Sequence, residues 1–233
     1  MIYILSIETT SPTCSVTLSA NEQVVAYKEN EGNNHSEVLA AYINDVIQQA
    51  GISVNDLDAV AVSKGPGSYT GLRIGTSTAK GLCYALDKPL IAVDTLYALA
   101  LAAHAKYPQA EILCPMIDAR RMEVYTAAYD NNMNKLLDVK AKIIDKNSFS
   151  AFLERGYTVF LGSGAMKTTD IITSANAHFD NKIYCSSLNM VPVAMEKYNH
   201  DDFEDVAYFE PFYLKEFVAR KSVNKILSLQ NKV

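Results

Sequence analysis

The amino-acid sequence predicts an α/β protein with two tandem lobes, each built from a mixed β-sheet flanked by helices. Three observations indicate this fold class. Apolar residues recur at strand-like and helix-like spacings along the chain, the elements follow the same order in both halves, and each half opens with three strands. Three meandering strands followed by helix–strand units produce a sheet with both antiparallel and parallel neighbours. We expect the lobes to comprise residues 1–106 and 107–233.

The first half begins with strands that turn residues separate from one another. Ser11-Pro12 and Asn21-Glu22 supply these turns, and Gly51 provides a stop for the first helix. The predicted elements are strands 2–8, 14–19 and 23–28, helix 36–50, strand 58–63, helix 71–86, strand 90–93 and helix 95–106.

The second half repeats this order after Pro108. Its predicted elements are strands 111–117, 123–129 and 135–143, helix 148–155, strand 158–161, a helix after Gly164, strand 182–184 and helix 191–198. Two such units in tandem resemble the plan of the actin, sugar-kinase and heat-shock ATPase superfamily, in which each lobe is similar to ribonuclease H. We therefore expect an actin-like fold.

The composition favours a soluble, cytoplasmic protein that does not enter a membrane. Hydrophobic residues make up 49% of the 233 residues, which is enough for a sizeable core, and no window reaches the roughly 18 consecutive apolar residues of a membrane span. The opening segment MIYILSIETT has neither a basic region before its apolar run nor a small-residue cleavage site after it. The four cysteines form no CxxC pair, so we expect reduced, buried thiols.

The net charge of −5 argues against a protein that grips a phosphate backbone by itself. If nucleic acid is involved, we expect a partner to supply most of the grip. The segment from Pro211 onward is locally basic, and we interpret it as a solvated surface and tail. Its charged residues are Lys215, Glu216, Arg220, Lys221, Lys225 and Lys232.

A glycine-rich run, Gly65 to Gly75, follows a predicted strand and opens a predicted helix. Backbone N–H groups at such a place can hold an anion. A Walker loop, however, needs Lys and then Ser or Thr directly after its last glycine, and here Leu72 and Arg73 follow Gly71. We favour a tight turn that permits a close helix approach over a nucleotide loop.

The helix behind this loop carries small residues on one face. Gly71, Gly75 and Ala79 recur every four residues, with Thr78 and Leu82 alongside. A glycine inside a helix costs up to about 1 kcal/mol relative to alanine, so two of them suggest a compensating benefit. The stripe would let another helix come close, either the helix at 36–50 or one from another subunit.

The run GPGSYTGLRIG closely resembles the signature of the TsaB (YeaZ) family. The resemblance spans nearly the whole chain, although Glu8 and Lys215 stand where the family often has Asp and Arg. Further segments that are similar to family landmarks are 7–10, 14–16, 35–39, 118–120, 123–125, 162–165 and 211–215.

The resemblance implies a non-catalytic partner subunit in the bacterial synthesis of threonylcarbamoyladenosine at tRNA adenosine 37. Such a subunit binds and supports the catalytic TsaD as a heterodimer within the threonylcarbamoyltransferase complex. The ATPase TsaE docks on this pair. The chain contacts tRNA only as part of the complex, and in isolation it can form a homodimer. We expect the interface on the helices at 36–50 and 71–86, through His35, Leu39, Tyr42, Gly71, Gly75, Thr78, Ala79 and Leu82.

Residues for catalysis are not evident, and we expect neither a metal nor another cofactor. TsaD binds a metal through a His-x-x-x-His pair, whereas here Leu39 stands four positions after His35. His104, His178 and His200 stand alone, so a metalloprotease is disfavoured.

The alternative is a self-sufficient actin-like ATPase or kinase. It would need phosphate-binding turns in both lobes and a carboxylate, for which Asp118 is a candidate. A ribonuclease H-type nuclease would need several converging carboxylates, and only Glu8 is evident. The candidates for a vestigial nucleotide site are Glu8, Thr9, Thr10, Gly162 and Gly164.

Overall fold

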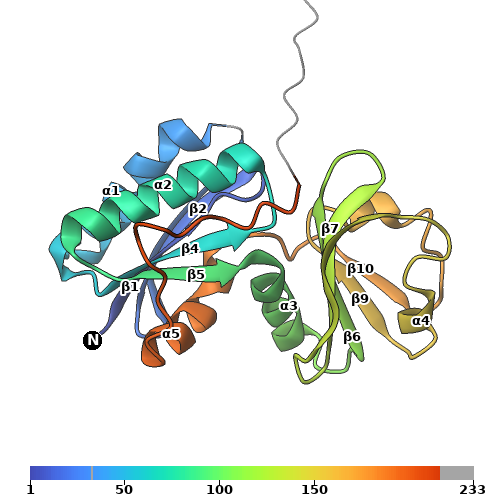
Figure 1. Ribbon diagram of the computed structural model, residues 1–233. Helices are drawn as coiled ribbons and strands as arrows, with labels where there is room; N and C mark the ends of the chain where they lie inside the picture. The colour runs from blue at the N-terminus through green and yellow to red at the C-terminus, as the bar shows by residue number, and fades with distance from the viewer. Residues whose placement is uncertain (33, 216–233) are drawn as a thin grey trace, which may run out of the picture.

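Two five-stranded mixed sheets lie side by side in the computed structural model, which describes residues 1–32 and 34–215 (Figure 1). The first sheet has the order β3-β2-β1-β4-β5, and the second has the order β10-β9-β6-β7-β8. The strands of the first sheet are β1 (Tyr3–Glu8), β2 (Thr13–Ala20), β3 (Gln23–Glu31), β4 (Ala59–Gly65) and β5 (Leu90–Asp94). Those of the second are β6 (Ile112–Asp118), β7 (Glu123–Asp130), β8 (Lys135–Ile143), β9 (Thr158–Leu161) and β10 (Ala177–Asp180).

The two sheets share one topology. In each, the first three strands pair antiparallel in sequence order, and the fourth strand pairs parallel with the first. The fifth strand then pairs parallel with the fourth. This doubled arrangement confirms the predicted fold class of two tandem lobes with mixed sheets.

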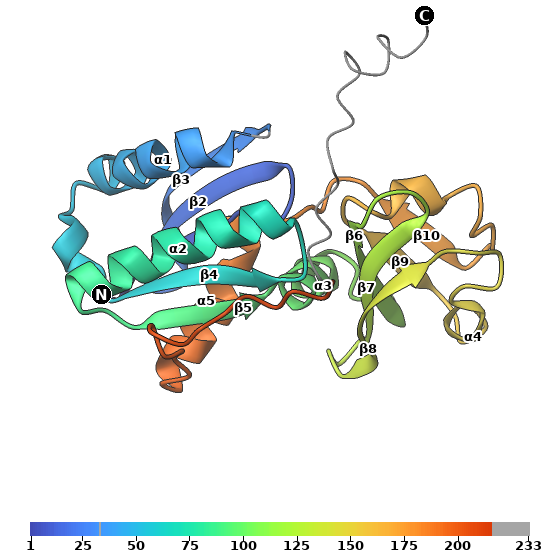
Figure 2. The same cartoon turned by 45° about the horizontal axis from the view of Figure 1, so that its top comes forward.

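Helices cover both faces of the first sheet. Helices α1 (His35–Ala50) and α2 (Tyr69–Leu86) lie next to each other on one face, and α5 (Val191–Asn199) lies on the other (Figure 2). The alternation along β1 explains this, because Leu5 and Ile7 belong to the core under α1 and α2 whereas Ile4 belongs to the core under α5. Helix α5 thus comes from the second half of the chain but packs on the first sheet.

The remaining helices are short or lie between the sheets. Helix α3 (Thr95–Lys106) packs against the core of the second sheet, and α4 (Ser150–Leu153) is a single turn. Three 3₁₀ turns are Val54–Asp56, Met166–Thr168 and Ser187–Met190. Over the two described ranges, no helix has the length and hydropathy required to cross a bilayer.

The sequence placed two elements of the second half incorrectly. The last strand lies at 177–180 instead of 182–184, because the Asp180 carboxylate accepts hydrogen bonds from the backbone N–H groups of Lys182 (2.6 Å) and Ile183 (3.3 Å) and turns the chain there. The helix expected after Gly164 is only the 3₁₀ turn 166–168.

The segment after α5 returns along the first lobe. The backbone N–H of Glu204 donates to the carbonyl of Leu90 at the edge strand β5, over 2.8 Å. Lys80 of α2 donates to the carbonyls of Ala207 (3.2 Å) and Phe209 (3.0 Å). The described chain then ends between the two lobes (Figure 1).

Candidate functional site

The glycine loop packs directly onto the turn that follows β1. The N–H of Ser68 donates to the carbonyl of Thr10 (2.7 Å), and the Ser68 hydroxyl caps α2 by accepting from the N–H of Gly71 (3.2 Å). The hydroxyl of Thr9 donates to the carbonyl of Gly71 (2.8 Å). The loop therefore closes over the end of β1 and joins it to the first turn of α2.

The small-residue stripe of α2 faces the interior of its own lobe. A Cβ atom at Gly71 would overlap the backbone carbonyl of Thr9, and one at Gly75 would overlap the Thr9 hydroxyl. Ala79 has no exposed surface. The prediction that these three residues form a subunit contact is therefore wrong, because the spacing shows which residues share a face but not what that face meets.

The other predicted contact residues, on α1 and α2, include both buried and partly exposed side chains. His35 is buried and donates from Nε2 to the carbonyl of Ser11 (2.8 Å), and Leu39 is part of the core. Their assignment to a partner interface is wrong for the same reason. Tyr42, Thr78 and Leu82 are partly exposed, so these three remain accessible to a partner.

The outer face of α2 shows a second small-residue row that the sequence analysis missed. Ser77, Gly81 and Ala85 are all exposed and again recur every four residues. A Cβ atom at Gly81 would meet nothing within 4 Å. No packing inside the lobe requires this glycine, whereas Thr9 requires Gly71 and Gly75. The distinguishing signal in the sequence was its offset of six residues from Gly75, which at 3.6 residues per turn rotates it about 120° away from Gly75 around the helix.

The turn after β1 uses its polar groups internally. The Glu8 carboxylate is buried and accepts bonds of 2.5 Å from both the N–H and the hydroxyl of Thr10. Burial raises the pKa of Glu8, and the bonds from Thr10 oppose that rise. This carboxylate is therefore directed at its own turn instead of at a cleft.

The corresponding turn in the second lobe, Gly162 to Gly164, is also closed. The N–H of Gly162 donates to Ile183 (3.1 Å), and the N–H of Gly164 donates to Met116 (2.9 Å). Gly162 has a φ of 91°, which only glycine adopts readily. The N–H groups of these two glycines, which would have held a phosphate, are thus committed to the fold.

A cleft of about 590 Å³ separates the two lobes near these turns. Glu29 and Glu31 give it an acidic wall, and the hydroxyl of Tyr184 donates to Glu29 at 3.0 Å. Among the described residues that line it, none is a lysine or arginine; they are Ser11, Pro12, Thr13, Glu29, Asn30, Glu31, Ser163, Asn181, Tyr184 and Cys185. Such a wall repels the phosphates of a nucleotide.

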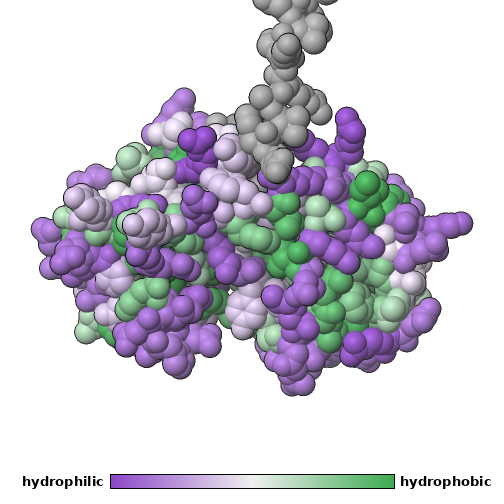
Figure 3. All heavy atoms as spheres, in the orientation of Figure 1, coloured by the Kyte–Doolittle hydropathy of each residue, from purple (hydrophilic) through white to green (hydrophobic). Residues whose placement is uncertain are grey.

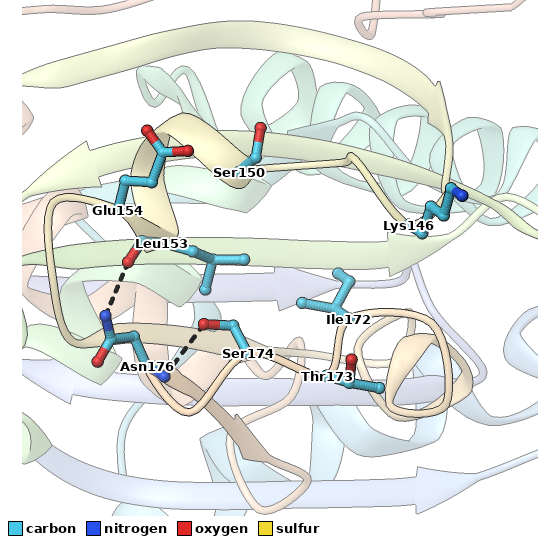
Figure 4. A pocket seen from close by; sticks show the side chains of 8 residues that line it. All are labelled: Lys146, Ser150, Leu153, Glu154, Ile172, Thr173, Ser174 and Asn176. Carbon is cyan, nitrogen blue, oxygen red and sulfur yellow. Dashed lines mark hydrogen bonds between the residues drawn. The ribbon is translucent and has the colours of Figure 1, made fainter.

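A second hollow, of about 390 Å³, lies on the second lobe away from this cleft (Figure 4). Leu153 and Ile172, both buried, form its apolar part. Asn176 donates from its side chain to the carbonyl of Leu153 (2.8 Å) and from its backbone to the Ser174 hydroxyl (3.2 Å). These bonds hold together the neighbouring loops of the second lobe.

The histidines and cysteines are separated in space. His200 donates to the carbonyl of Glu196 (2.8 Å), and His178 lies 3.3 Å from the Tyr107 hydroxyl. Across residues 1–32 and 34–215, no three His, Cys, Asp or Glu side chains are grouped to hold a metal ion. The cysteines are free and buried, at positions 14, 83, 114 and 185.

The segment 211–215 ties the glycine loop to the second lobe. The N–H of Phe212 donates to the carbonyl of Lys64 (2.7 Å), and the Tyr213 ring lies 4.9 Å from the ring of Tyr69. Lys215 forms an ion pair with Glu123 at the start of β7. Three family landmarks, distant in sequence, therefore meet at one place between the lobes.

The family model described as "TsaD: tRNA N6-adenosine threonylcarbamoyltransferase" matches residues 19–219. The chain is 30% identical over 229 residues to the Escherichia coli protein "tRNA threonylcarbamoyladenosine biosynthesis protein TsaB", covering 94% of this chain and 97% of that one. The chain belongs to the TsaB (YeaZ) family.

Other relatives agree with membership of the TsaB family. The Bacillus subtilis TsaB is 37% identical over 127 residues, which cover 54% of each chain. The structure of YeaZ from Pseudomonas aeruginosa matches with a TM-score of 0.77 at 24% identity, covering 92% of this chain and 100% of that one, and it shows the same fold. A Staphylococcus aureus tRNA N6-adenosine threonylcarbamoyltransferase is 34% identical over 124 residues, but these cover only 36% of that protein. The likeness to the Escherichia coli TsaB therefore extends over 94% of the chain, and the likeness to this transferase extends over 46% of it.

Proposed function

We propose that this TsaB family member is a non-catalytic subunit of the bacterial tRNA threonylcarbamoyladenosine synthesis complex. It binds TsaD through its first lobe, helix against helix, and supports the transfer of the threonylcarbamoyl group to adenosine 37 of tRNA. TsaE docks on this pair, and the complex works in the cytoplasm. Family membership supports the pathway, and the outer surface of α1 and α2 supports the mode of binding.

The observation that carries the proposal is the exposed glycine in the interior of α2. Gly81 lowers helix stability by about 1 kcal/mol relative to alanine, and nothing in the lobe compensates for it. With Ser77 and Ala85 it forms a low surface on which a second helix can approach closely. Ala40 and Ala41 of the neighbouring α1 are exposed as well and extend the same kind of surface.

The geometry between the lobes supports a partner over a self-sufficient ATPase or kinase. The cleft has an acidic wall at Glu29 and Glu31, and the Glu8 carboxylate is directed at Thr10. Calorimetry with Mg-ATP tests the rival. Tight binding with turnover by the isolated chain would favour the ATPase.

The test of the partner role is the Gly81→Leu substitution. We expect the variant to fold, because the added side chain meets open space, and we expect it to lose co-purification with TsaD, because leucine separates the two helices. The matched control is Ala151→Leu, an exposed alanine on α4 of the second lobe, which should retain TsaD. Retention of TsaD by a folded Gly81→Leu chain would refute the proposed contact.

The same surface can pair with a second copy of the chain in the absence of TsaD. A C2 dimer would place α2 against its own symmetry mate. Size-exclusion chromatography with light scattering should then show a dimer for the isolated wild-type chain, a monomer for Gly81→Leu and a heterodimer after TsaD is added.

A further inference from the structure

Cations and tyrosine rings form two groups, one on each lobe, which residues 213–215 connect at the place where the described chain ends. The guanidinium carbon of Arg73 lies 5.7 Å from the ring centre of Tyr69, whose ring lies 4.9 Å from that of Tyr213. Two residues further on, the Lys215 ammonium lies 5.5 Å from the ring centre of Tyr125 in β7. Both cations are within the distance at which an aromatic face attracts a positive charge. We call these five residues, together with Arg120 and Arg121, the cation–tyrosine strip.

Arginines are concentrated at this strip. The sequence contains five arginines, and three of them are Arg73, Arg120 and Arg121. All three are exposed. Within the described parts of the chain, none of these three guanidinium groups forms an ion pair with a carboxylate. As far as residues 1–32 and 34–215 are concerned, three positive charges without a carboxylate partner are therefore available to a ligand.

Arg120 is linked to the strip through its electrostatic effect on Tyr125, and Arg121 follows it in the sequence. Burial raises the pKa of Tyr125; the positive charges of Lys215 and Arg120 lower it, and the carboxylate of Glu123 raises it. Three carboxylates are also nearby: Glu123 is paired with Lys215, Asp118 is paired with Lys167 at 2.6 Å, and the charge of Glu210 acts on the Tyr213 hydroxyl. Figure 3 shows hydrophilic side chains beside the end of the described chain. With three arginines and two lysines (Lys215 and Lys167) against these three carboxylates, the surface keeps a positive balance and also presents aromatic faces.

Arginine and tyrosine in this combination match the chemistry of RNA. A guanidinium group binds phosphate oxygens in a fork and remains charged at every relevant pH. Tyrosine rings offer faces on which unstacked bases can lie, and stacking of this kind contributes about 1–3 kcal/mol per base. An acidic protein surface would satisfy the cations but would make no comparable use of adjacent tyrosine faces.

We propose that the cation–tyrosine strip contacts the backbone and unpaired bases of tRNA while the chain is bound to TsaD. This inference rests on the proposed function, because it assigns a tRNA-contacting surface to the same subunit. Because the chain has a net charge of −5, the strip alone does not hold tRNA, and its contacts add to those that TsaD makes. Arg73 and Gly81 both lie on α2, so tRNA on the strip would lie next to the docked TsaD.

The test compares tRNA binding by complexes that differ only in exposed arginines. The full-length chain with TsaD is titrated with a fluorescently labelled tRNA transcript that has adenosine at position 37, at several salt concentrations. The variant is Arg73→Ala/Arg120→Ala/Arg121→Ala, and the matched control is Arg155→Ala, an exposed arginine beyond α4. We expect the triple variant to co-purify with TsaD but to bind tRNA about 10-fold more weakly, with the slope of log K against log salt reduced by about one per arginine.

Three results would overturn the inference. One is a triple variant that binds tRNA as tightly as Arg155→Ala does. Another is equal affinity for tRNA with and without the wild-type chain. The third is loss of TsaD itself from the triple variant, which would make the strip a protein contact.

A second measurement separates this inference from the proposed function. Full-length wild-type chain is irradiated with tRNA that carries 4-thiouridine, with and without TsaD, and cross-linked peptides are identified by mass spectrometry. Cross-links to peptides with Tyr69 or Tyr213 support the strip even if Gly81→Leu still binds TsaD. Cross-links confined to other peptides, or none on this chain, would count against it.

Discussion

The hydroxyl of Thr9 donates a 2.8 Å hydrogen bond to the carbonyl oxygen of Gly71, and so joins the end of β1 to the first turn of α2. The backbone of Thr9 lies so close to α2 that a methyl group at Gly71 would overlap it. The glycine-rich signature therefore sets the distance between this helix and its sheet. Its first role is structural, and the surface left on the other side of α2 is available to a partner.

Alanine substitutions at Gly71 and Gly81 should have opposite effects on stability. Gly71→Ala forces α2 away from Thr9 and should lower the free energy of unfolding by about 1–3 kcal/mol or more. Gly81→Ala meets open space and should raise it by up to about 1 kcal/mol through helix propensity. Urea denaturation of both variants measures these changes. Equal effects at the two positions would contradict the packing described for α2.

Replacement of Glu8 by glutamine should change the pH dependence of stability. Burial raises the pKa of Glu8 above its ordinary value of 4.5, so the folded chain holds a proton that the unfolded chain has already released. Below pH 4.5 Glu8 is protonated in both states, so its burial does not lower the free energy of unfolding. As the pH rises from 4.5 toward the raised pKa, the unfolded state is favoured more and more, and the free energy of unfolding falls. Glu8→Gln should gain stability relative to wild type over that rise, as urea unfolding below and well above pH 4.5 would show. The exposed Glu154→Gln is the control, and a difference independent of pH would disprove the assignment.

Asp180 should affect the pH dependence of stability in the opposite direction to Glu8. Although burial opposes it, bonds from Lys106 and Tyr107, each 2.6 Å, lower the pKa of Asp180 from 3.8 to about 2. The carboxylate then contributes stability that is fully present above pH 3.8 and is lost as the pH falls through about 2. Asp180→Asn should unfold with about 2 kcal/mol less free energy at neutral pH, with the difference shrinking in acid. The exposed Asp170→Asn should change little in the same measurement, and a deficit at Asp180 that persists to the lowest pH would count against the ion pair.

The order of helices and strands could be predicted because the spacing of apolar residues and the position of turn residues are local properties of the sequence. β1 illustrates this, since its alternation of Leu5 and Ile7 against Ile4 reports a sheet covered on both faces. The last strand was misplaced because Ile183 and Tyr184 suggest a strand, whereas Asp180 bonds to the two N–H groups that such a strand would need. A polar side chain that accepts hydrogen bonds from backbone N–H groups, and so prevents a strand, cannot be recognised from the spacing of apolar residues.

The site was harder to predict because it depends on contacts between distant segments. Thr9 and Gly71 are 62 positions apart, and the sequence does not show that they touch. The spacing of Gly71 and Gly75 correctly indicated that something comes close, but the neighbour is a strand end and not a helix of another subunit. Gly81 shows the opposite case, because its lack of any internal neighbour only becomes visible once the chain is folded.

Helix α5 has a consequence for the order of events during synthesis. When the ribosome has produced residues 1–106, the first sheet is complete but Ile4, Ala61 and Ile91 still lack α5 over them. That helix emerges only after every strand of the second sheet has been made. The amino-terminal lobe, although translated first, therefore finishes folding last, and the nascent chain must keep an apolar face protected until its carboxyl-terminal part arrives.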